Sequence, residues 1–125
     1  MKNKLVTILF TVALIFAGGG IAYAGEHTAQ AIEHGSMAIK HGGMGHADVL
    51  VEHAKESLKH AKAAADEAQD EMTKQHLNEG IKHLKEGIKH GEMGHADVAT
   101  EHVQEGLKHL EAAGGGASGG ASEGY

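Results

Sequence analysis

The sequence contains no cysteine, no proline, no tryptophan and no arginine. Without cysteine, disulfides and thiolate ligands are excluded, so a metal ion can be held only by nitrogen, oxygen or thioether sulfur. Without arginine, and with a formal net charge of −6, the chain is poorly suited to neutralise phosphates, which argues against nucleic acid as a partner. We also find no nucleophile motif, haem-attachment motif or phosphate-binding loop, so the sequence predicts no enzyme.

Large apolar residues are scarce once the N-terminal segment is set aside. From Gly25 onward, Val, Ile, Leu and Met are thinly spread and no Phe remains. A domain with so few large apolar groups is expected to be marginally stable alone. We therefore expect one small domain over 25–113 that needs a further source of stability. The Gly, Ala and Ser residues of 114–125 predict a flexible tail.

The N-terminal segment 1–24 has the pattern of a cleavable signal peptide. Lys2 and Lys4 precede an apolar run over 5–17, and Ala22-Tyr23-Ala24 is a cleavage site with small residues at its ends. The run is shorter than the roughly 20 residues of a membrane span. We expect cleavage near Ala24/Gly25 and a mature periplasmic chain with no membrane attachment.

The histidines define an internal repeat. They form four triplets with a spacing of seven residues, and a shift of 49 positions places the first six on the last six. This pattern predicts a duplicated helical hairpin with repeats over 27–64 and 76–113. The twelve positions are His27, His34, His41, His46, His53, His60, His76, His83, His90, His95, His102 and His109.

Each triplet lies in a stretch rich in Ala, Glu, Lys and Leu, which favours helix. The clearest apolar stripe is Leu77, Ile81, Leu84 and Ile88, at helical spacing. Because the loops between paired helices are short, neighbouring helices must be antiparallel. The sequence therefore predicts an all-α fold, an antiparallel up-down-up-down four-helix bundle made of two tandem helical hairpins.

Two features leave alternatives open. The segment 63–71 has no helix breaker, so the second and third helices could fuse and the hairpins close across a dimer. Because Asp70 or Thr73 can cap a new helix, we favour a break and a monomer. Glycines inside the predicted helices indicate either close helix approach or room beside a bound ion; they are Gly35, Gly80, Gly87 and Gly106.

The spacing of seven places each triplet in a nearly straight stripe, because successive histidines differ by about 20° around the helix. They are about 10.5 Å apart along the axis, too far to share one ion. Partner ligands must come from a neighbouring helix or from nearby acidic and sulfur groups. The best candidates for two-imidazole sites are the hairpin loops, where His41 faces His46 and His90 faces His95.

Neutral imidazole suits copper, nickel and zinc, and copper(II) is expected to bind most tightly. Met44 and Met93 lie inside the hairpin loops and are additional candidate ligands, since a thioether also accepts copper(I).

Several glutamates precede a histidine by four residues, such as Glu56 before His60, but a solvated face shared with lysine is the favoured interpretation of these. The sequence thus predicts a metal buffer. The alternative is a pH-responsive or proton-buffering periplasmic protein without a metal role.

The rival metal class, a di-iron oxidase, requires Glu-x-x-His pairs within helices. Only Glu92-Met93-Gly94-His95 has that spacing, and it lies at a predicted loop. We therefore expect no di-iron centre.

Three runs, Glu52–Ala64, Gly80–Leu84 and Gly94–His102, resemble the small metal-binding protein family. The resemblance extends over about residues 26–112. It implies a periplasmic, histidine-rich four-helix bundle that binds copper, nickel and zinc, with the twelve histidines as ligands and copper sequestration as the function. The chain departs from the family pattern in the loop methionines Met44 and Met93, and in its Gly/Ser tail.

Overall fold

The computed structural model describes residues 23–114, and within that range the regular structure is entirely helical. Residues 1–22 of the predicted leader and residues 115–125 of the predicted tail lie outside the described residues. Tyr23 and Ala24, which the sequence assigns to the leader, are the first residues of the first helix, and Gly114 is the last residue of the fourth. The helices are α1 (Tyr23–Gly43), α2 (Ala47–Glu67), α3 (Glu71–Glu92) and α4 (Ala96–Gly114).

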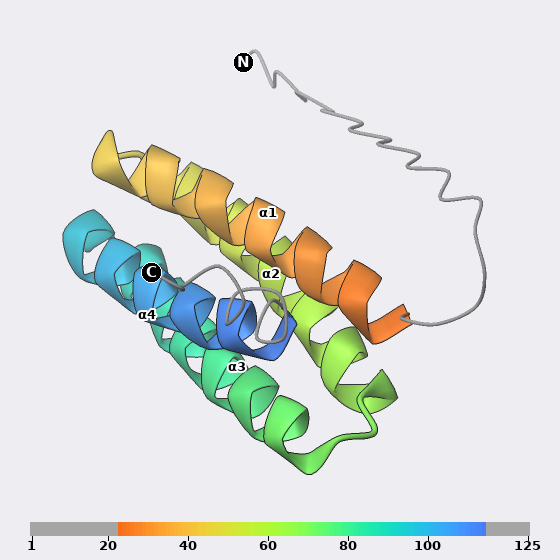
Figure 1. Ribbon diagram of the computed structural model, residues 1–125. Coiled ribbons are helices and arrows are strands. Elements are labelled where there is room, and N and C mark those ends of the chain that lie inside the picture. The colour runs from red at the N-terminus through yellow and green to blue at the C-terminus, as the bar shows by residue number, and fades with distance from the viewer. Residues whose placement is uncertain (1–22, 115–125) are drawn as a thin grey trace, which may run out of the picture.

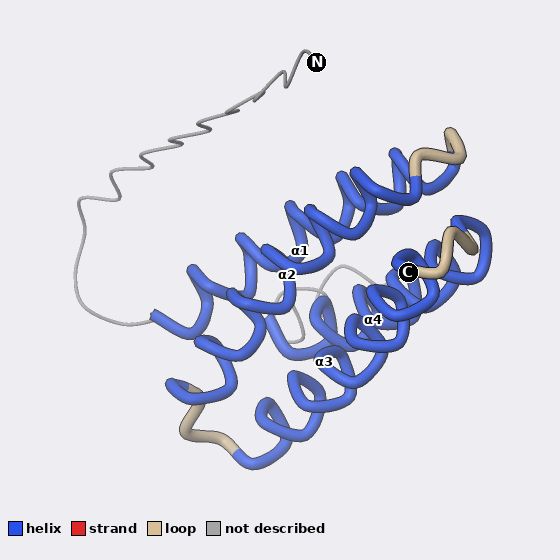
Figure 2. The backbone as a smooth tube through the Cα atoms, turned by 180° about the vertical axis from the view of Figure 1, so that it is seen from behind, coloured by secondary structure: helices blue, strands red, loops and turns tan. Residues whose placement is uncertain are grey.

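The helices lie side by side, and the chain reverses at each of three short loops (Figure 1). α1 packs on α2 and α3 on α4, while α2 also contacts α3 and α1 contacts α4. The α1–α2 and α3–α4 loops lie at one end of the bundle, and the α2–α3 loop lies at the other (Figure 2). The prediction of an all-α protein with four helices is confirmed. None of the four described helices has the length and hydropathy of a membrane span.

The two hairpin loops have the same backbone geometry. The His46 amide donates to the His41 carbonyl at 2.9 Å, and the His95 amide donates to the His90 carbonyl at 2.9 Å. Each loop turns at a glycine with positive φ, 77° at Gly45 and 80° at Gly94. Glycine adopts this left-handed conformation without steric penalty, so it closes a helix end that other residues would strain.

The break between α2 and α3 falls at residues 68–70. The Asp70 carboxylate accepts hydrogen bonds from the Thr73 amide at 2.8 Å and from its hydroxyl at 2.9 Å. These bonds cap the first turn of α3 and hold the pKa of Asp70 below its usual value. The predicted break is confirmed, with Asp70 as the capping residue.

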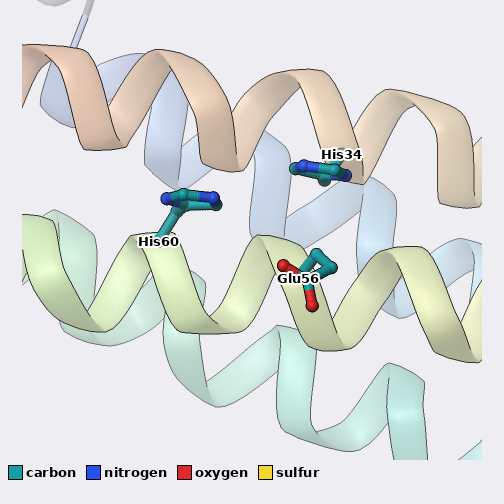
Figure 3. Close-up of side chains that lie close together, drawn as sticks. All are labelled: His34, Glu56 and His60. Carbon is teal, nitrogen blue, oxygen red and sulfur yellow. The ribbon is translucent and has the colours of Figure 1, made fainter. Parts of the chain in front are cut away.

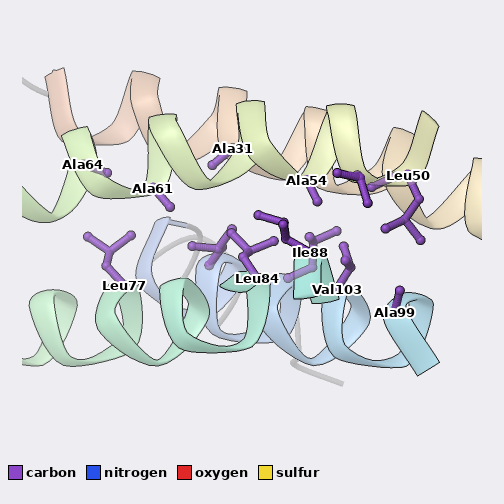
Figure 4. Close-up of a cluster of buried hydrophobic side chains, with 14 of the residues drawn as sticks. Ala31, Leu50, Ala54, Ala61, Ala64, Leu77, Leu84, Ile88, Ala99 and Val103 are labelled. Atoms are coloured by element: carbon purple, nitrogen blue, oxygen red, sulfur yellow. The ribbon is translucent and has the colours of Figure 1, made fainter. Parts of the chain in front are cut away.

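The core lies between the α1–α2 layer and the α3–α4 layer (Figure 4). Its largest fully buried apolar side chains are four leucines and a valine, and alanines supply most of the rest. α1 buries Ala31 and Ala38, while Ile32 and Ile39, the apolar residues on which its predicted stripe rests, pack at the margin. The core is therefore thin, as the composition predicts.

Some interior glycines mark close helix contacts. A Cβ at Gly80 would lie 2.8 Å from Leu110 Cδ2 and 3.1 Å from the Gly106 carbonyl oxygen. A Cβ at Gly106 would lie 3.2 Å from the Gly80 carbonyl oxygen. Of the two interpretations left open, close approach of α3 and α4 is the one that explains these positions.

Candidate metal centre

Five histidines alternate between α1 and α2 along their interface, and a sixth, the N-cap residue of α2, ends the series. Their consecutive ring centroids are 5.5, 5.7, 5.9, 5.5 and 6.0 Å apart. We call this series the first ladder. In order along the hairpin, it consists of His27, His60, His34, His53, His41 and His46.

The second ladder lies between α3 and α4 and repeats the first. Its consecutive centroids are 6.1, 5.5, 6.1, 5.2 and 6.0 Å apart. Each member stands one repeat length after its counterpart in the first ladder. In order, the members are His76, His109, His83, His102, His90 and His95.

The ladders combine the sequence spacing with a particular stagger of the two antiparallel helices. Histidines on one helix rise about 10.5 Å per seven-residue step. Two facing stripes that are staggered by half a step place each imidazole between two others, at about half that rise. The ring distances of 5.2 to 6.1 Å match this arrangement. Each internal imidazole therefore has two possible partners across the interface.

The ladders border the core and remain open to water along one side. Ten histidines are half-buried, while His46 and His95 at the loops are exposed. Three imidazole nitrogens are nevertheless shielded from solvent and have no hydrogen-bond partner among the described residues; these are Nδ1 of His34, His41 and His90. Buried polar atoms normally have a partner, so the orphaned nitrogens fit a set of ligands for a metal ion.

The distance between one histidine pair is suited to coordination. Nδ1 of His27 and Nδ1 of His60 are 3.2 Å apart. Two nitrogen ligands at about 2.0 Å from a tetrahedral ion are about 3.3 Å apart. The other nitrogen of His27, Nε2, lies 3.7 Å from the Glu67 carboxylate. At 3.7 Å this is an ion-pair contact, longer than a hydrogen bond.

Two clusters add a carboxylate to an imidazole pair. The ligand atoms of His34, Glu56 and His60 all lie within 4.8 Å of one another. Figure 3 shows His34 of α1 opposite His60 of α2, with Glu56 beside them. The ligand atoms of Glu79, His83 and His109 form the second such cluster. Two imidazoles and one carboxylate are a common protein ligand set for zinc and related ions.

The first ladder favours neutral imidazole at two positions. Burial, followed by the nearby His34 and His41, lowers the pKa of His53. Burial, followed by His34 and His27, lowers the pKa of His60. Neutral imidazole is the form that binds metal, so these environments favour the ligand state over the protonated state.

In the second hairpin, a lysine holds one of the nearby carboxylates. Lys108 Nζ lies 2.7 Å from the Glu105 carboxylate. This hydrogen bond is the main cause of the lowered pKa of Glu105. Glu105 is the counterpart of Glu56, and in this hairpin it pairs with Lys108 while Glu79 completes the second cluster.

The twelve histidines that the sequence predicts as ligands are the members of the two ladders, and the rings of the predicted loop pairs His41/His46 and His90/His95 are 6.0 Å apart in both cases. The structure also places Met44 and Met93 in these loops, each half-exposed. Sequence reasoning missed the pairings along the shafts of the hairpins. The predicted solvated position holds for Glu56, which is exposed, whereas Glu79 is half-buried; both lie four residues before a histidine of their cluster.

The chain is similar in sequence to a known protein family over most of its length. The sequence profile of the small metal-binding protein family matches residues 2–113, a span that includes both ladders. No curated protein sequence is similar enough to the chain to count as a match. The family profile covers most of the 125 residues, so the chain belongs to the small metal-binding protein family.

Proposed function

We propose that this protein binds and buffers divalent transition metals in the periplasm, with copper favoured and nickel and zinc also bound. The observation that carries the proposal is the pair of histidine ladders, in which consecutive imidazoles are 5.2 to 6.1 Å apart. Solvation alone requires no such register. The twelve histidines are the proposed ligands, Met44 and Met93 are additional ones, and no catalytic residue is proposed.

The ladder geometry favours a buffer over a single selective site. Because each internal imidazole has two neighbours, adjacent ions compete for shared ligands. Such sites are similar to one another and partly open to water. Selectivity then follows the general order of affinity, in which copper(II) exceeds nickel(II) and zinc(II).

Metal binding also supplies the stability that the thin core lacks. A ligand that binds only the folded state stabilises it by about 2.7 kcal/mol at a concentration one hundred times its Kd. In each ladder, an ion shared by two imidazoles would link two helices. We propose that this linkage holds an antiparallel up-down-up-down bundle together as a monomer, following cleavage of the leader near Ala24/Gly25.

The test is calorimetric titration of the mature, metal-free chain with copper(II), nickel(II) and zinc(II), with melting followed by circular dichroism. Replacing the six histidines of the first ladder by glutamine should remove about half of the tight binding capacity. It should also halve the metal-induced rise in melting temperature.

A chain with Gln30, Gln69, Gln75 and Gln104 replaced by alanine is the control, because these polar residues lie outside the ladders. It should bind like the native chain. If the native chain binds no more metal than a variant without any histidine, metal buffering is wrong.

Proton buffering is the second candidate, because burial and neighbouring histidines lower the pKa of His53 and His60, so these imidazoles respond to their surroundings. The same titration separates the two functions. A metal buffer loses affinity as the pH falls from 7.5 to 5, because protons compete for imidazole. A proton buffer shows no metal affinity at either pH.

A further inference from the structure

Two loops at one end of the bundle differ chemically from the rest of the ladders. The α1–α2 loop and the α3–α4 loop share this end (Figure 2). Each loop follows a half-buried histidine, His41 or His90, that ends one histidine stripe. Each loop also contains an exposed histidine, His46 or His95, that begins the next stripe. Each also carries a methionine that is 50% exposed, Met44 in one and Met93 in the other. An exposed thioether thus occurs at the same place in both repeats.

The backbone tethers each thioether to its imidazole pair. The amides of Met44 and His46 both donate to the His41 carbonyl, at 3.1 and 2.9 Å. In the second loop, the amides of Met93 and His95 donate to the His90 carbonyl at the same two distances. The methionine side chain is unbranched and flexible. From this anchor it can bring sulfur to an ion between the two rings.

The imidazoles themselves indicate a ligand at this place. Nδ1 of His41 and Nδ1 of His90 are buried and have no hydrogen-bond partner among the described residues. The two histidines are counterparts in the internal repeat, so the same orphaned atom occurs in both loops. Each ring lies 6.0 Å from that of its exposed partner, His46 or His95. Each loop therefore presents two imidazoles and one thioether.

Carboxylates are better placed elsewhere. The two carboxylate-containing clusters of the described residues involve His34/His60 and His83/His109, away from the loops. Near the second loop, Glu92 is held by Lys55, with Nζ 2.8 Å from its carboxylate. Two imidazoles with a soft thioether favour copper(I) more than the carboxylate-containing ligand sets of the shafts do.

We propose that each hairpin loop is a copper(I) site, formed by His41, Met44 and His46 in one repeat and by His90, Met93 and His95 in the other. The inference rests on the proposed metal-binding role of the ladders and adds that two parts of each ladder bind different kinds of ion. The loop end holds cuprous ions, and the shafts of the ladders hold divalent ions.

The test uses the Met44→Leu/Met93→Leu double variant, which keeps side-chain size and replaces only the sulfur. Copper(I) affinity is measured without oxygen, in competition with a colorimetric cuprous chelator. We expect a loss of roughly tenfold or more, since even the loss of an outer-shell partner has that effect on metal affinity. X-ray absorption at the copper edge should show sulfur in the native chain and only nitrogen or oxygen in the variant.

Met72→Leu is the matched control, since Met72 is 68% exposed on α3 and lies outside both loops; it should keep native copper(I) affinity. A second variant, His46→Gln/His95→Gln, should lose copper(I) affinity as the methionine variant does. Unchanged copper(I) affinity in the methionine variant, with no sulfur signal in the native chain, would overturn the inference.

Titration of the same proteins with nickel(II) keeps the two proposals apart. Nickel(II) affinity should survive the loss of both loop methionines, because the shaft imidazoles remain. If nickel(II) binds and the methionine variant has native copper(I) affinity, only the loop sites are wrong. If the native chain binds no nickel(II), zinc(II) or copper(II), the buffering function itself is wrong.

Discussion

The two hairpins carry the same histidine ladder but differ where their helices cross. In the first hairpin, the buried Ser57 hydroxyl donates to the Ala31 carbonyl at 2.6 Å. Their counterparts in the second repeat are Gly106 and Gly80, whose backbones approach so closely that a Cβ at Gly106 would lie 3.2 Å from the Gly80 oxygen. α1 and α2 are joined at their crossing by a side-chain hydrogen bond, whereas α3 and α4 approach closely because glycine has no side chain. Both keep the facing histidine stripes within reach.

The hairpins also differ in the carboxylate beside the equivalent imidazole pairs. Glu56 of α2 joins His34 and His60, whereas Glu79 of α3 joins His83 and His109. The counterpart of Glu79 is Gln30, a residue without charge. Both hairpins therefore have the same imidazole pair. The carboxylate comes from the second helix of the first hairpin, but from the first helix of the second hairpin. The two clusters are thus related but not identical ligand sets.

The largest expected effect comes from making the second crossing resemble the first. Gly106→Ser introduces a Cβ 3.2 Å from the Gly80 oxygen and 3.4 Å from Leu84 Cγ, so the facing backbone of α3 must shift by a few tenths of an ångström. We expect a loss of about 1–3 kcal/mol, typical of overpacking, in urea unfolding of the metal-free chain. Gly43→Ala is the control, since no described atom lies within 4 Å of that Cβ. Equal stability of Gly106→Ser and the native chain would refute the close-contact interpretation.

Exchanging the carboxylate between hairpins is the next test. In a chain whose first-ladder histidines are glutamine, Glu79→Gln should weaken zinc(II) binding by roughly tenfold, because it removes one ligand of the second cluster. In the complementary chain, which keeps only the first ladder, Gln30→Glu should strengthen binding. Competition with a zinc indicator measures both. Glu111→Gln, on an exposed part of α4, should change nothing, and an equal effect there would exclude a specific role for Glu79.

A smaller effect is expected at the first crossing. Ser57→Ala removes the buried hydroxyl that donates to the Ala31 carbonyl. We expect a loss of about 0.5–1.5 kcal/mol, the usual net contribution of a hydrogen bond, measured by urea unfolding. Ser57→Gly should be less stable still, because glycine also weakens the helix. A more stable Ser57→Ala chain would show that packing, and not the hydrogen bond, determines this crossing.

The smallest effect is the pH dependence of the metal-free chain. Folding lowers the pKa of His53 and His60 below the unfolded value of about 6.5. The unfolded chain therefore binds more protons in this range, and stability rises with pH. The full stability of the folded chain with respect to these two groups is present above pH 6.5. It is lost as the pH falls through 6.5 towards the pKa values of the two groups in the folded state.

Melting temperatures at pH 7.5 and pH 5 measure this dependence. In the His53→Gln/His60→Gln variant, the melting temperatures at pH 7.5 and pH 5 should differ by less than they do in the native chain. This holds whatever the effect of the substitutions on stability at pH 7.5. If the melting temperature of the variant falls as much between pH 7.5 and pH 5 as that of the native chain, His53 and His60 are not the source of the acid sensitivity.

Much of the fold could be predicted because its determinants are local in sequence. The absence of proline, the glycines at the loops and the capping residue Asp70 each act within a few residues, and they mark the four helices. The histidine register was equally visible, since a spacing of seven defines a stripe on one helix whatever surrounds it.

The pairing of histidines across helices could not be predicted, because it depends on how far each helix slides and rotates against its neighbour. That stagger is determined by non-local contacts such as Gly80 with Gly106 and Ser57 with Ala31. The choice of carboxylate could not be predicted either. Glu105 precedes His109 by four residues, as Glu79 precedes His83, but only Glu79 belongs to the second cluster, while Glu105 pairs with Lys108.

The most direct test of the central claim is nuclear magnetic resonance of the imidazole groups during a zinc(II) titration of the mature, metal-free chain. Zinc(II) is diamagnetic, so every histidine stays observable. The ladder geometry predicts that histidines shift together with partners across each interface, for example His34 with His60 and His83 with His109. Imidazole resonances that stay unchanged, while only carboxylates respond, would contradict metal binding by the ladders.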